Sequence, residues 1–396
     1  MKLTVVIVSY NVRYYLEQCI VSVQRATKDI DHEIYIVDNA SDDDTVDYLR
    51  KRFGDDITII ESTQNLGFAR ANNLAIRQSA EQFSCSDEDV DTTPSDYILL
   101  LNPDTFIAED SLQKVLDFMD AHPQAGGVGA KMHNPDGSLA PESRRALPTP
   151  WVSMLKMLGF SKRYYMKHLP WDEPGRIDVI SGAFCMLRRE AIDKVGALDE
   201  DFFMYGEDID LSYRLLKGGY ENWYVPADIV HYKGESTVKS SYRYVHVFYQ
   251  AMLIFFRKHY GHLSFFVTLP IKIAIYFRAF IALLQMLYER MRSSLGFADK
   301  PRADVSYYFV GSTKMLNQCR ALAKRRGLTA TYIHTKELSS LEQQLPSGAS
   351  VVYDAETFSF QQMIEQTAML TDKHPTLGTY STRRKMLITQ VEIIKG

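Results

Sequence analysis

The first third of the chain alternates between short apolar runs with strand character and amphipathic segments with helix character. The apolar runs span residues 3–8, 33–37, 57–61 and 97–101, and the helical segments span residues 14–26, 43–53 and 69–82. Parallel strands need a long crossover between them, and a helix is the usual one, so this alternation predicts a parallel sheet flanked by helices. A helical pattern at 112–121 and an apolar stretch from Gly126 continue the same order. We therefore expect an α/β fold.

The length and charge of the chain limit the classes of protein to which it can belong. It has 396 residues and a formal net charge of −4, which leaves room for more than one domain and lacks the basic surplus of a nucleic-acid-binding protein. The α/β pattern restarts after residue 305, with strands expected at 307–310, 331–333 and 350–353 and helices at 314–326 and 361–370. We divide the chain into a first α/β domain (1–260), an amphipathic helical segment (261–300) and a small C-terminal α/β domain without a visible catalytic motif (301–396). The Gly311-Ser312 turn of the last domain could hold a phosphate or be a plain strand-to-helix turn.

The helical segment is apolar over residues 263–287 but is interrupted by Pro270, Lys272 and Arg278. Charges near the middle of a hydrophobic stretch are costly inside a bilayer, which argues against a membrane-spanning helix. Basic residues among aromatic ones are typical of a helix lying on an anionic membrane surface, and the alternative is a helix packed against the protein. The N-terminal apolar run is too short for a signal sequence, and the four cysteines form no CxxC pair. We expect a cytoplasmic protein attached peripherally to the inner face of the cytoplasmic membrane.

Two aspartates follow directly on predicted strands. Asp38 comes after the second apolar run, and Asp104 comes after the fourth through the turn Asn102-Pro103-Asp104. Open α/β sheets bind ligands outside the carboxyl ends of their strands, so both carboxylates are candidate ligand contacts. The Asp38 carboxylate can accept the N3–H of uracil or thymine, whereas Ser41 and Asp42 are better explained as helix caps.

Asp104 is the first candidate ligand of a divalent metal. A nucleotide-sugar diphosphate needs such a cation, or several basic groups, to stabilise the charge of the leaving group, and oxygen ligands suit Mg²⁺ or Mn²⁺. His231, which follows a strand-like segment at 223–225 and an expected turn at 226–228, would add a nitrogen ligand and favour Mn²⁺. A single histidine is most often structural, so this second ligand depends on the family resemblance described below.

An acidic cluster, Glu207, Asp208 and Asp210, opens a helical pattern. Transfer of a group to an alcohol needs a carboxylate that removes the hydroxyl proton as the attack develops. We assign that role to Asp208, take Glu207 as the second candidate and regard Asp210 as structural. The alternative is that these carboxylates only stabilise the positive end of the helix dipole.

The turn Asn65-Leu66-Gly67 precedes a helical segment that begins with small residues. Glycine in such a turn lets the backbone approach a ribose or a diphosphate closely, and Arg70 adds a cation that could meet a phosphate oxygen. Taken alone, an Asn-x-Gly turn is more often only a turn.

Seven short motifs, in this order along the chain, resemble those of family 2 glycosyltransferases, and the nearest likeness is to bacterial rhamnosyltransferase-like members. The motifs are Val8-Ser9-Tyr10-Asn11, Val37-Asp38-Asn39-Ala40-Ser41, Asn65-Leu66-Gly67, Asn102-Pro103-Asp104, Ser181-Gly182-Ala183, Gly206-Glu207-Asp208 and His231. The resemblance covers roughly the first two thirds of the chain, and the ordered succession of motifs is more specific than any single one.

The resemblance implies a GT-A fold and an inverting transfer from a nucleoside-diphosphate sugar by direct displacement. The implied roles place Ser9, Tyr10 and Asp38 at the nucleobase, Asn65 and Gly67 beside the nucleotide, Asn102, Ser181 and Gly182 at the nucleotide sugar, Asp104 and His231 at the metal, and Asp208 as the catalytic base. The chain departs from the family's usual Asp-x-Asp motif at Asn102, which removes one carboxylate from the metal site.

We therefore predict a metal-dependent inverting glycosyltransferase. The expected donor is a dTDP- or UDP-sugar, with rhamnose as the first guess for the sugar, and the expected acceptor is a lipid-linked saccharide in cell-envelope polysaccharide synthesis. Residues 144–174 and 233–243 are candidate lids over the substrate or ordinary linkers. The alternatives are a nucleotidyltransferase, which would need a basic Gly-rich loop that residues 8–13 lack, and a catalytically silent scaffold or nucleotide-binding module acting through its C-terminal domain.

Overall fold

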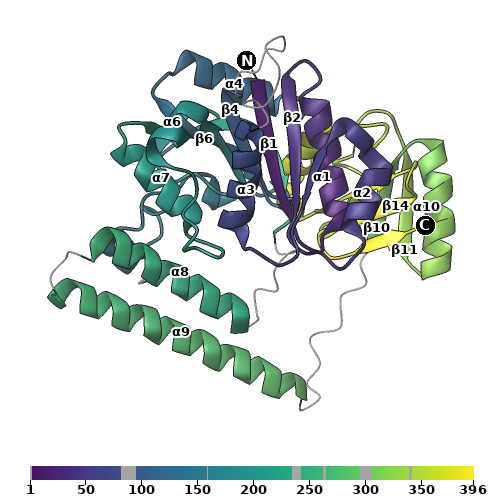
Figure 1. The fold of residues 1–396 in the computed structure, drawn as a ribbon. Coiled ribbons are helices and arrows are strands. Elements are labelled where there is room, and N and C mark those ends of the chain that lie inside the picture. Colours follow the sequence, from purple (N-terminus) through teal and green to yellow (C-terminus); the bar gives the residue numbers. More distant parts are fainter. Residues whose placement is uncertain are drawn as a thin grey trace, which may run out of the picture.

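The protein folds into two β-sheets that lie side by side, and helices pack on the faces of these sheets (Figure 1). The structure is a computed structural model and describes residues 2–81, 95–157, 159–233, 242–261, 265–294, 306–338 and 341–396. Within these residues the first sheet has nine strands and the second has six. The α/β class predicted from the alternating pattern is confirmed.

The first sheet has the strand order β3-β2-β1-β4-β8-β6-β9-β5, with β7 beside β9. Its strands are β1 (Lys2–Ser9), β2 (Asp31–Asp38), β3 (Thr58–Glu61), β4 (Tyr97–Leu101), β5 (Thr105–Ile107), β6 (Ala125–His133), β7 (Gly175–Ile177), β8 (Phe184–Arg188) and β9 (Glu221–His231). The first four strands pair in parallel, and β8, β5 and β7 pair antiparallel with their neighbours. The sheet is therefore mixed, and the carboxyl ends of β1, β2 and β4 meet at one edge.

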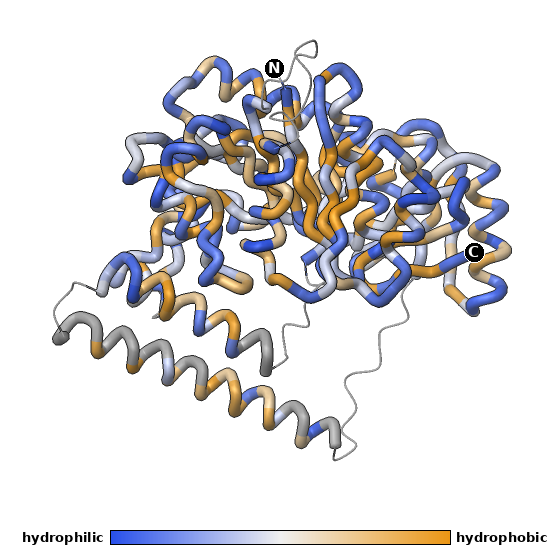
Figure 2. Tube along the Cα trace, viewed as in Figure 1, coloured by the Kyte–Doolittle hydropathy of each residue, from blue (hydrophilic) through white to orange (hydrophobic). Residues whose placement is uncertain are grey.

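Helices cover both faces of this sheet. They are α1 (Arg13–Ala26), α2 (Thr45–Phe53), α3 (Phe68–Glu81), α4 (Ser111–Ala121), α5 (Pro150–Met157), α6 (Arg189–Val195) and α7 (Glu207–Lys217), with short 3₁₀ turns at Gly54–Asp56 and Pro141–Ser143. One core joins the sheet to α1, α2 and α4, and a second core joins its other face to α3, α6 and α7. Because both faces are covered, the central strands are apolar throughout (Figure 2).

One expectation about the chain before His231 is wrong. The turn expected at 226–228 does not form, because β9 continues without a break from Glu221 to His231. Proline cannot donate a ladder hydrogen bond, and a shift in the register between β6 and β9 lies at this point, between the pairs Gly129↔Tyr224 and Lys131↔Asp228. The bulge therefore accommodates Pro226 inside the strand.

The second sheet has the order β11-β10-β12-β13-β14-β15, parallel as far as β13 and antiparallel after it. Its elements are β10 (Ser306–Gly311), α10 (Thr313–Arg326), β11 (Thr329–His334), β12 (Ser350–Asp354), α11 (Phe360–Met369), a 3₁₀ turn at Thr371–Lys373, β13 (Thr376–Ser381), β14 (Met386–Thr389) and β15 (Ile393–Lys395). At the Gly311-Ser312 turn, the backbone N–H of Ser312 donates to the Asp354 carboxylate at 3.2 Å. A carboxylate of the protein therefore stands where a phosphate would bind.

Two further helices, α8 (Tyr242–Tyr260) and α9 (Phe265–Ser294), pack against each other below the first sheet (Figure 1). Among the described residues, no helix combines the length and the apolar character that crossing a membrane requires. Large apolar side chains on α9 are exposed, namely Leu269, Ile273, Tyr276, Phe277, Phe280, Leu284, Leu287, Tyr288 and Met291. Residues 234–241 of the second candidate lid, and the side chains of Lys272 and Arg278, lie outside the described part of the chain.

Candidate active site

A cavity of about 610 Å³ opens beside the carboxyl end of β4 and is closed on one side by α8. Seven of the residues predicted from the sequence line it: Asn102, Asp104, Ser181, Gly182, Glu207, Asp208 and His231. They come from four separate stretches of the chain, so the fold brings together what the sequence keeps apart. The remaining wall has an aromatic and apolar part, with Phe248, Tyr249, Met252, Phe255 and Phe256 contributed by α8, and a charged part with Glu142, Arg145, Lys156 and Lys233.

Strand pairing brings Asp104 and His231 together. The strand β5 begins directly after Asp104 and pairs antiparallel with β9, so that Thr105 lies opposite His231. The His231 Nε2 atom is 3.2 Å from the Asp104 Oδ1 atom. The side-chain amide of Asn102 is 3.4 Å from the same imidazole nitrogen. A carboxylate and an imidazole therefore face one point in the cavity, with an amide next to them.

Asp208 stands at the start of α7 and is held by groups from two other segments. Its Oδ2 atom accepts hydrogen bonds from the Arg145 guanidinium and, at 3.3 Å, from the backbone N–H of Gly182. Burial alone would lower the pKa of Arg145, but the adjacent Asp208 carboxylate outweighs that effect and raises it, so the guanidinium stays charged. The Asp208 Oδ1 atom accepts only the backbone N–H of Ile209, at 2.8 Å, among the described residues.

Glu207 differs from its neighbour because it forms no ion pair with any residue that the structure describes. Its side chain is 6% exposed, and its Oε2 atom has no hydrogen-bond partner among the described residues. Burial, reinforced by the negative charge of Asp208, raises the pKa of Glu207 to about 8. Near neutral pH this carboxyl group is therefore largely protonated and can donate a hydrogen bond into the cavity.

The predicted nucleotide end lies at the carboxyl ends of β1 and β2, where Ser9 and Asp38 are opposite each other in the parallel register. Asp38 is 4% exposed, and one of its oxygens accepts the backbone N–H of Ser41 at 3.0 Å. Its other oxygen, Oδ1, and the Ser9 Oγ atom are buried without a hydrogen-bond partner among the described residues. Buried polar atoms are rarely left unpaired, so two neighbouring ones point to a ligand that would satisfy them.

The turn at Asn65 and Gly67 is held by the protein itself. The Asn65 Oδ1 atom accepts the Asn39 side-chain N–H and the Gly67 backbone N–H, each at 3.0 Å. Gly67 has φ +80°, and a Cβ atom there would lie 2.4 Å from the carbonyl oxygen of Phe203. Glycine is therefore required at this position for packing between segments.

Six predicted site residues do not line the cavity, namely Ser9, Asp38, Asn65 and Gly67, described above, and Tyr10 and Arg70. Tyr10 is half-buried just after β1, and Arg70 is exposed with its Nε atom 3.8 Å from a carboxylate oxygen of Glu200. Sequence reasoning missed Arg145, which it placed only within a candidate lid. The adjacent basic pair Arg144-Arg145 in a segment poor in periodicity was the available signal.

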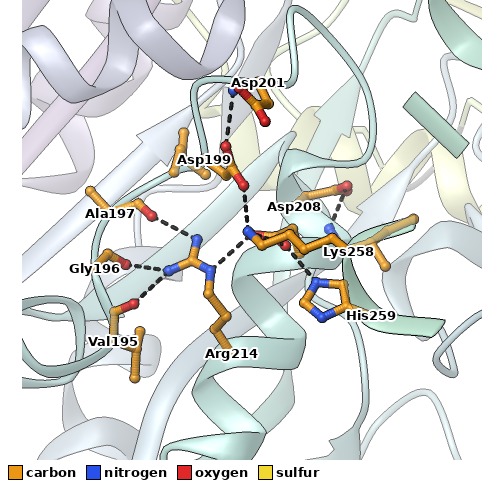
Figure 3. Close-up of polar contacts among 12 residues, drawn as sticks. Val195, Gly196, Ala197, Asp199, Asp201, Asp208, Arg214, Lys258 and His259 are labelled. Carbon is orange, nitrogen blue, oxygen red and sulfur yellow. Dashed lines mark hydrogen bonds and ion pairs between the residues drawn. The ribbon is translucent and has the colours of Figure 1, made fainter. Parts of the chain in front are cut away.

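Asp210 joins α7 to α8 through Arg214 of α7 and Lys258 and His259 of α8, and these three partners are labelled in Figure 3. It is 0% exposed, and its carboxylate accepts hydrogen bonds from His259 Nε2 at 2.6 Å and Arg214 Nε at 2.8 Å, with Lys258 Nζ at 2.9 Å. Burial would raise the pKa of Asp210, but the bonds from Lys258, Arg214 and His259 outweigh it and lower that pKa. The expectation that Asp210 is structural agrees with this arrangement, which also ties the aromatic wall of the cavity to the helix of Asp208.

Comparison with known proteins gives the family. The model of the family described as glycosyl transferase family 2 matches residues 4–196. The chain is 31% identical over 262 residues to the N-acetylglucosaminyl-diphospho-decaprenol L-rhamnosyltransferase of Mycobacterium tuberculosis, an alignment that covers 64% of this chain and 83% of the relative. The chain belongs to glycosyl transferase family 2.

This family 2 glycosyltransferase has further relatives of the same kind. It is 30% identical over 168 residues to the rhamnosyltransferase WbbL of Escherichia coli, over 42% of this chain and 61% of the relative. Among solved structures, the mannosyltransferase PcManGT of Pyrobaculum calidifontis, in complex with GDP-Man and Mn²⁺, aligns with a TM-score of 0.43 and 18% identity over 81% of this chain and 80% of that one. The family match and the two rhamnosyltransferase relatives make the chain a rhamnosyltransferase-like family 2 glycosyltransferase, as the ordered motifs indicate.

Proposed function

We propose that the enzyme transfers L-rhamnose, with inversion, from a pyrimidine nucleoside-diphosphate sugar to a hydroxyl of a polyprenyl-diphosphate-linked saccharide in cell-envelope polysaccharide synthesis. The observation that carries the proposal is the 31% identity to the mycobacterial rhamnosyltransferase, which extends over 83% of that relative. We take dTDP-rhamnose as the first donor and UDP-sugars as the next, because the Asp38 carboxylate suits the imide N–H that thymine and uracil share.

The nucleobase would occupy the edge at β1 and β2. There the unpaired Asp38 Oδ1 atom accepts the imide N–H of the base, and the Ser9 hydroxyl, also unpaired, donates to a base carbonyl. Both atoms then gain the partners that they lack among the described residues. This pairing supports thymine or uracil over adenine and cytosine, because neither of those two bases presents a ring N–H in a nucleotide.

Asp104 and His231 would hold a divalent metal. Among the described residues, no cluster of three or more His, Cys, Asp or Glu side chains suited to a metal forms, so this pair supplies two ligands and leaves positions for the donor diphosphate and water. A mixed oxygen and nitrogen set fits Mn²⁺ better than Mg²⁺. When bound, the metal stabilises the negative charge of the departing nucleoside diphosphate.

Asp208 would act as the catalytic base. Its Oδ1 atom removes the proton of the acceptor hydroxyl while the acceptor oxygen forms a bond to C1 of the sugar and the bond from C1 to the diphosphate oxygen breaks. The proton stays on Asp208, and the nucleoside diphosphate leaves with the electron pair. Arg145 and the Gly182 N–H hold the Oδ2 atom, which fixes the direction in which Oδ1 points.

The lipid part of the acceptor would approach along α8. The aromatic wall that α8 gives the cavity and the exposed apolar stripe on α9, including Ile273, Phe277 and Phe280, support an interfacial position on the membrane. Large apolar side chains at intervals of three and four residues form a single stripe along a helix, which suits insertion at a bilayer surface.

The test is a transfer assay with the purified protein, Mn²⁺, dTDP-rhamnose or UDP-sugars, and a saccharide diphosphate on a short prenol. We expect rhamnosylated product, a decrease of about 10³-fold or more in kcat for Asp208→Asn, and an unchanged donor KM. The matched control is Asp201→Asn, because Asp201 is exposed and lies outside the cavity. Binding of dTDP without turnover of any donor would favour the silent scaffold, and full activity of Asp208→Asn would refute the role of the base.

A further inference from the structure

A second cleft, of about 420 Å³, lies between the two sheets and shares no lining residue with the active-site cavity. One wall is the face of α1 that carries Tyr14, Glu17 and Arg25, together with Arg52 from α2. The other wall comes from the C-terminal domain. The cleft therefore lies at one part of the interface between the catalytic domain and the C-terminal domain, which has no part in the proposed transfer, and a shared apolar core joins the two domains beside it.

The C-terminal wall lies where an α/β sheet usually binds its ligand. The strands β10, β12 and β13 are parallel, and the cleft is lined by Ala355 and Glu356, which follow β12, and by Ser381 and Arg383, at and just after the end of β13. Ligands of open α/β sheets bind outside these carboxyl ends. Because the Asp354 carboxylate already accepts the Ser312 backbone N–H at the start of α10, the part of this edge that is open to a ligand is the one that lines the cleft.

Four arginines and two glutamates line the cleft: Arg25, Arg52, Arg383, Arg384, Glu17 and Glu356. The lining thus has two more positive than negative groups. The Glu356 carboxylate accepts hydrogen bonds from Ser381 Oγ at 2.7 Å and the Thr382 backbone N–H at 2.8 Å, so it serves to hold its own hairpin. Neutral hydrogen-bond donors of the same domain therefore hold the Glu356 carboxylate in place.

One buried carboxylate, that of Glu17, contacts two guanidinium groups. The Glu17 Oε1 atom accepts a hydrogen bond from the Nε atom of Arg52 and forms an ion pair with the Nε atom of Arg384, each at 3.0 Å, while its other oxygen accepts from the Tyr48 hydroxyl. The terminal nitrogens of both arginines have no hydrogen-bond partner among the described residues. The Arg383 side chain, which is exposed, makes no hydrogen bond or ion pair there either.

We propose that this cleft binds a small molecule through a phosphate group, held by Arg52, Arg383 and Arg384. The planar guanidinium fork matches phosphate oxygens in pairs, and the unused nitrogens of three arginines supply more donors than one phosphate needs. The ligand contacts both domains and so stabilises their arrangement. Free phosphates, sugar phosphates and nucleotides share this chemistry.

The test is calorimetric titration of the full chain with inorganic pyrophosphate in EDTA, where no metal assists binding at the active site. We expect saturable binding that Asp104→Asn leaves unchanged and that Arg383→Ser with Arg384→Ser weakens about tenfold or more. The matched control is Arg325→Ser with Arg326→Ser, which removes the same charge from an exposed end of α10. Sugar 1-phosphate and dTMP, titrated in the same way, distinguish the source of the phosphate.

The Arg384 substitution also removes an ion pair with Glu17, so a second variant keeps the test clear of folding effects. Arg383→Glu changes an exposed side chain without a described partner and should abolish pyrophosphate binding while leaving the circular dichroism spectrum unchanged. Absence of saturable binding to the native protein up to about 10 mM, equal weakening by the control pair, or loss in Asp104→Asn would overturn the proposal. No outcome depends on turnover, so the proposed transferase function is tested separately.

Discussion

Replacing Asp210 by alanine tests whether the joint between α7 and α8 stabilises the catalytic helix. The carboxylate is 0% exposed and receives three donors, from Arg214, Lys258 and His259. Removing one partner of a buried charge network costs roughly 3–5 kcal/mol, because the other charges remain buried and unpaired. Two of the donors keep other partners: Arg214 donates to three backbone carbonyls and Lys258 to Asp199.

Because these partners remain, we expect the lower end of that range, a loss of about 3 kcal/mol in the free energy of unfolding. Urea unfolding at pH 7, followed by tryptophan fluorescence and circular dichroism, measures it. The matched control is Asp47→Ala, whose carboxylate is exposed and 3.9 Å from Arg50, and which should cost about 0.5 kcal/mol or less. A loss below 1 kcal/mol for Asp210→Ala, or one equal to the control, would refute the reasoning.

The pH dependence of the stability provides an independent check on the charge assigned to the Asp210 carboxyl group. The folded pKa of this carboxyl is lowered, so its contribution to stability is present above its unfolded pKa of about 3.9 and is lost as the pH falls through the lower folded value. Asp210→Asn keeps the shape and removes this titration. The difference in stability between the native protein and Asp210→Asn should therefore shrink below pH 4, and a difference that stays constant down to pH 2 would contradict the assigned charge state.

Three further predictions concern other parts of the molecule. Because the folded pKa of Glu207 is raised from 4.5 to about 8, its neutral form contributes stability that is lost as the pH rises over this interval, so Glu207→Gln should flatten the fall in Tm between those pH values; identical profiles would contradict it. Gly67→Ala should cost about 2 kcal/mol or more in urea unfolding, since its Cβ meets the Phe203 carbonyl, whereas Gly54→Ala, with φ +55° and nothing within 4 Å, should cost about 1 kcal/mol. Phe277→Glu should weaken cosedimentation with anionic liposomes without changing the fold, and unchanged binding would remove the case for membrane contact at this stripe.

Much of the fold was predictable because it depends on local patterns. The helices α1, α2 and α3 begin and end within two residues of the expected positions, and the restart of the α/β pattern after residue 305 marks the second sheet. Local patterns gave a wrong prediction at β9. Pro226 indicated a turn, but pairing with β6 keeps this segment in a strand. The strand forms because of the register between β6 and β9, which are distant in the sequence, and a short stretch of sequence does not contain that information.

The candidate site divides in the same way. Sequence alone determined which carboxylates stand at strand ends and helix starts, because the residues that place Asp38, Asp104 and Asp208 are their immediate neighbours. Only the tertiary structure decided their partners: the pairing of β5 with β9 sets His231 beside Asp104, and a segment without periodicity delivers Arg145 to Asp208. It also decided that the carboxylate of Glu207 is buried and unpaired while that of Asp208, one residue away, is paired. Burial and charge pairing are sums over neighbours that are distant in the chain, and the order of residues does not specify them until the chain has folded.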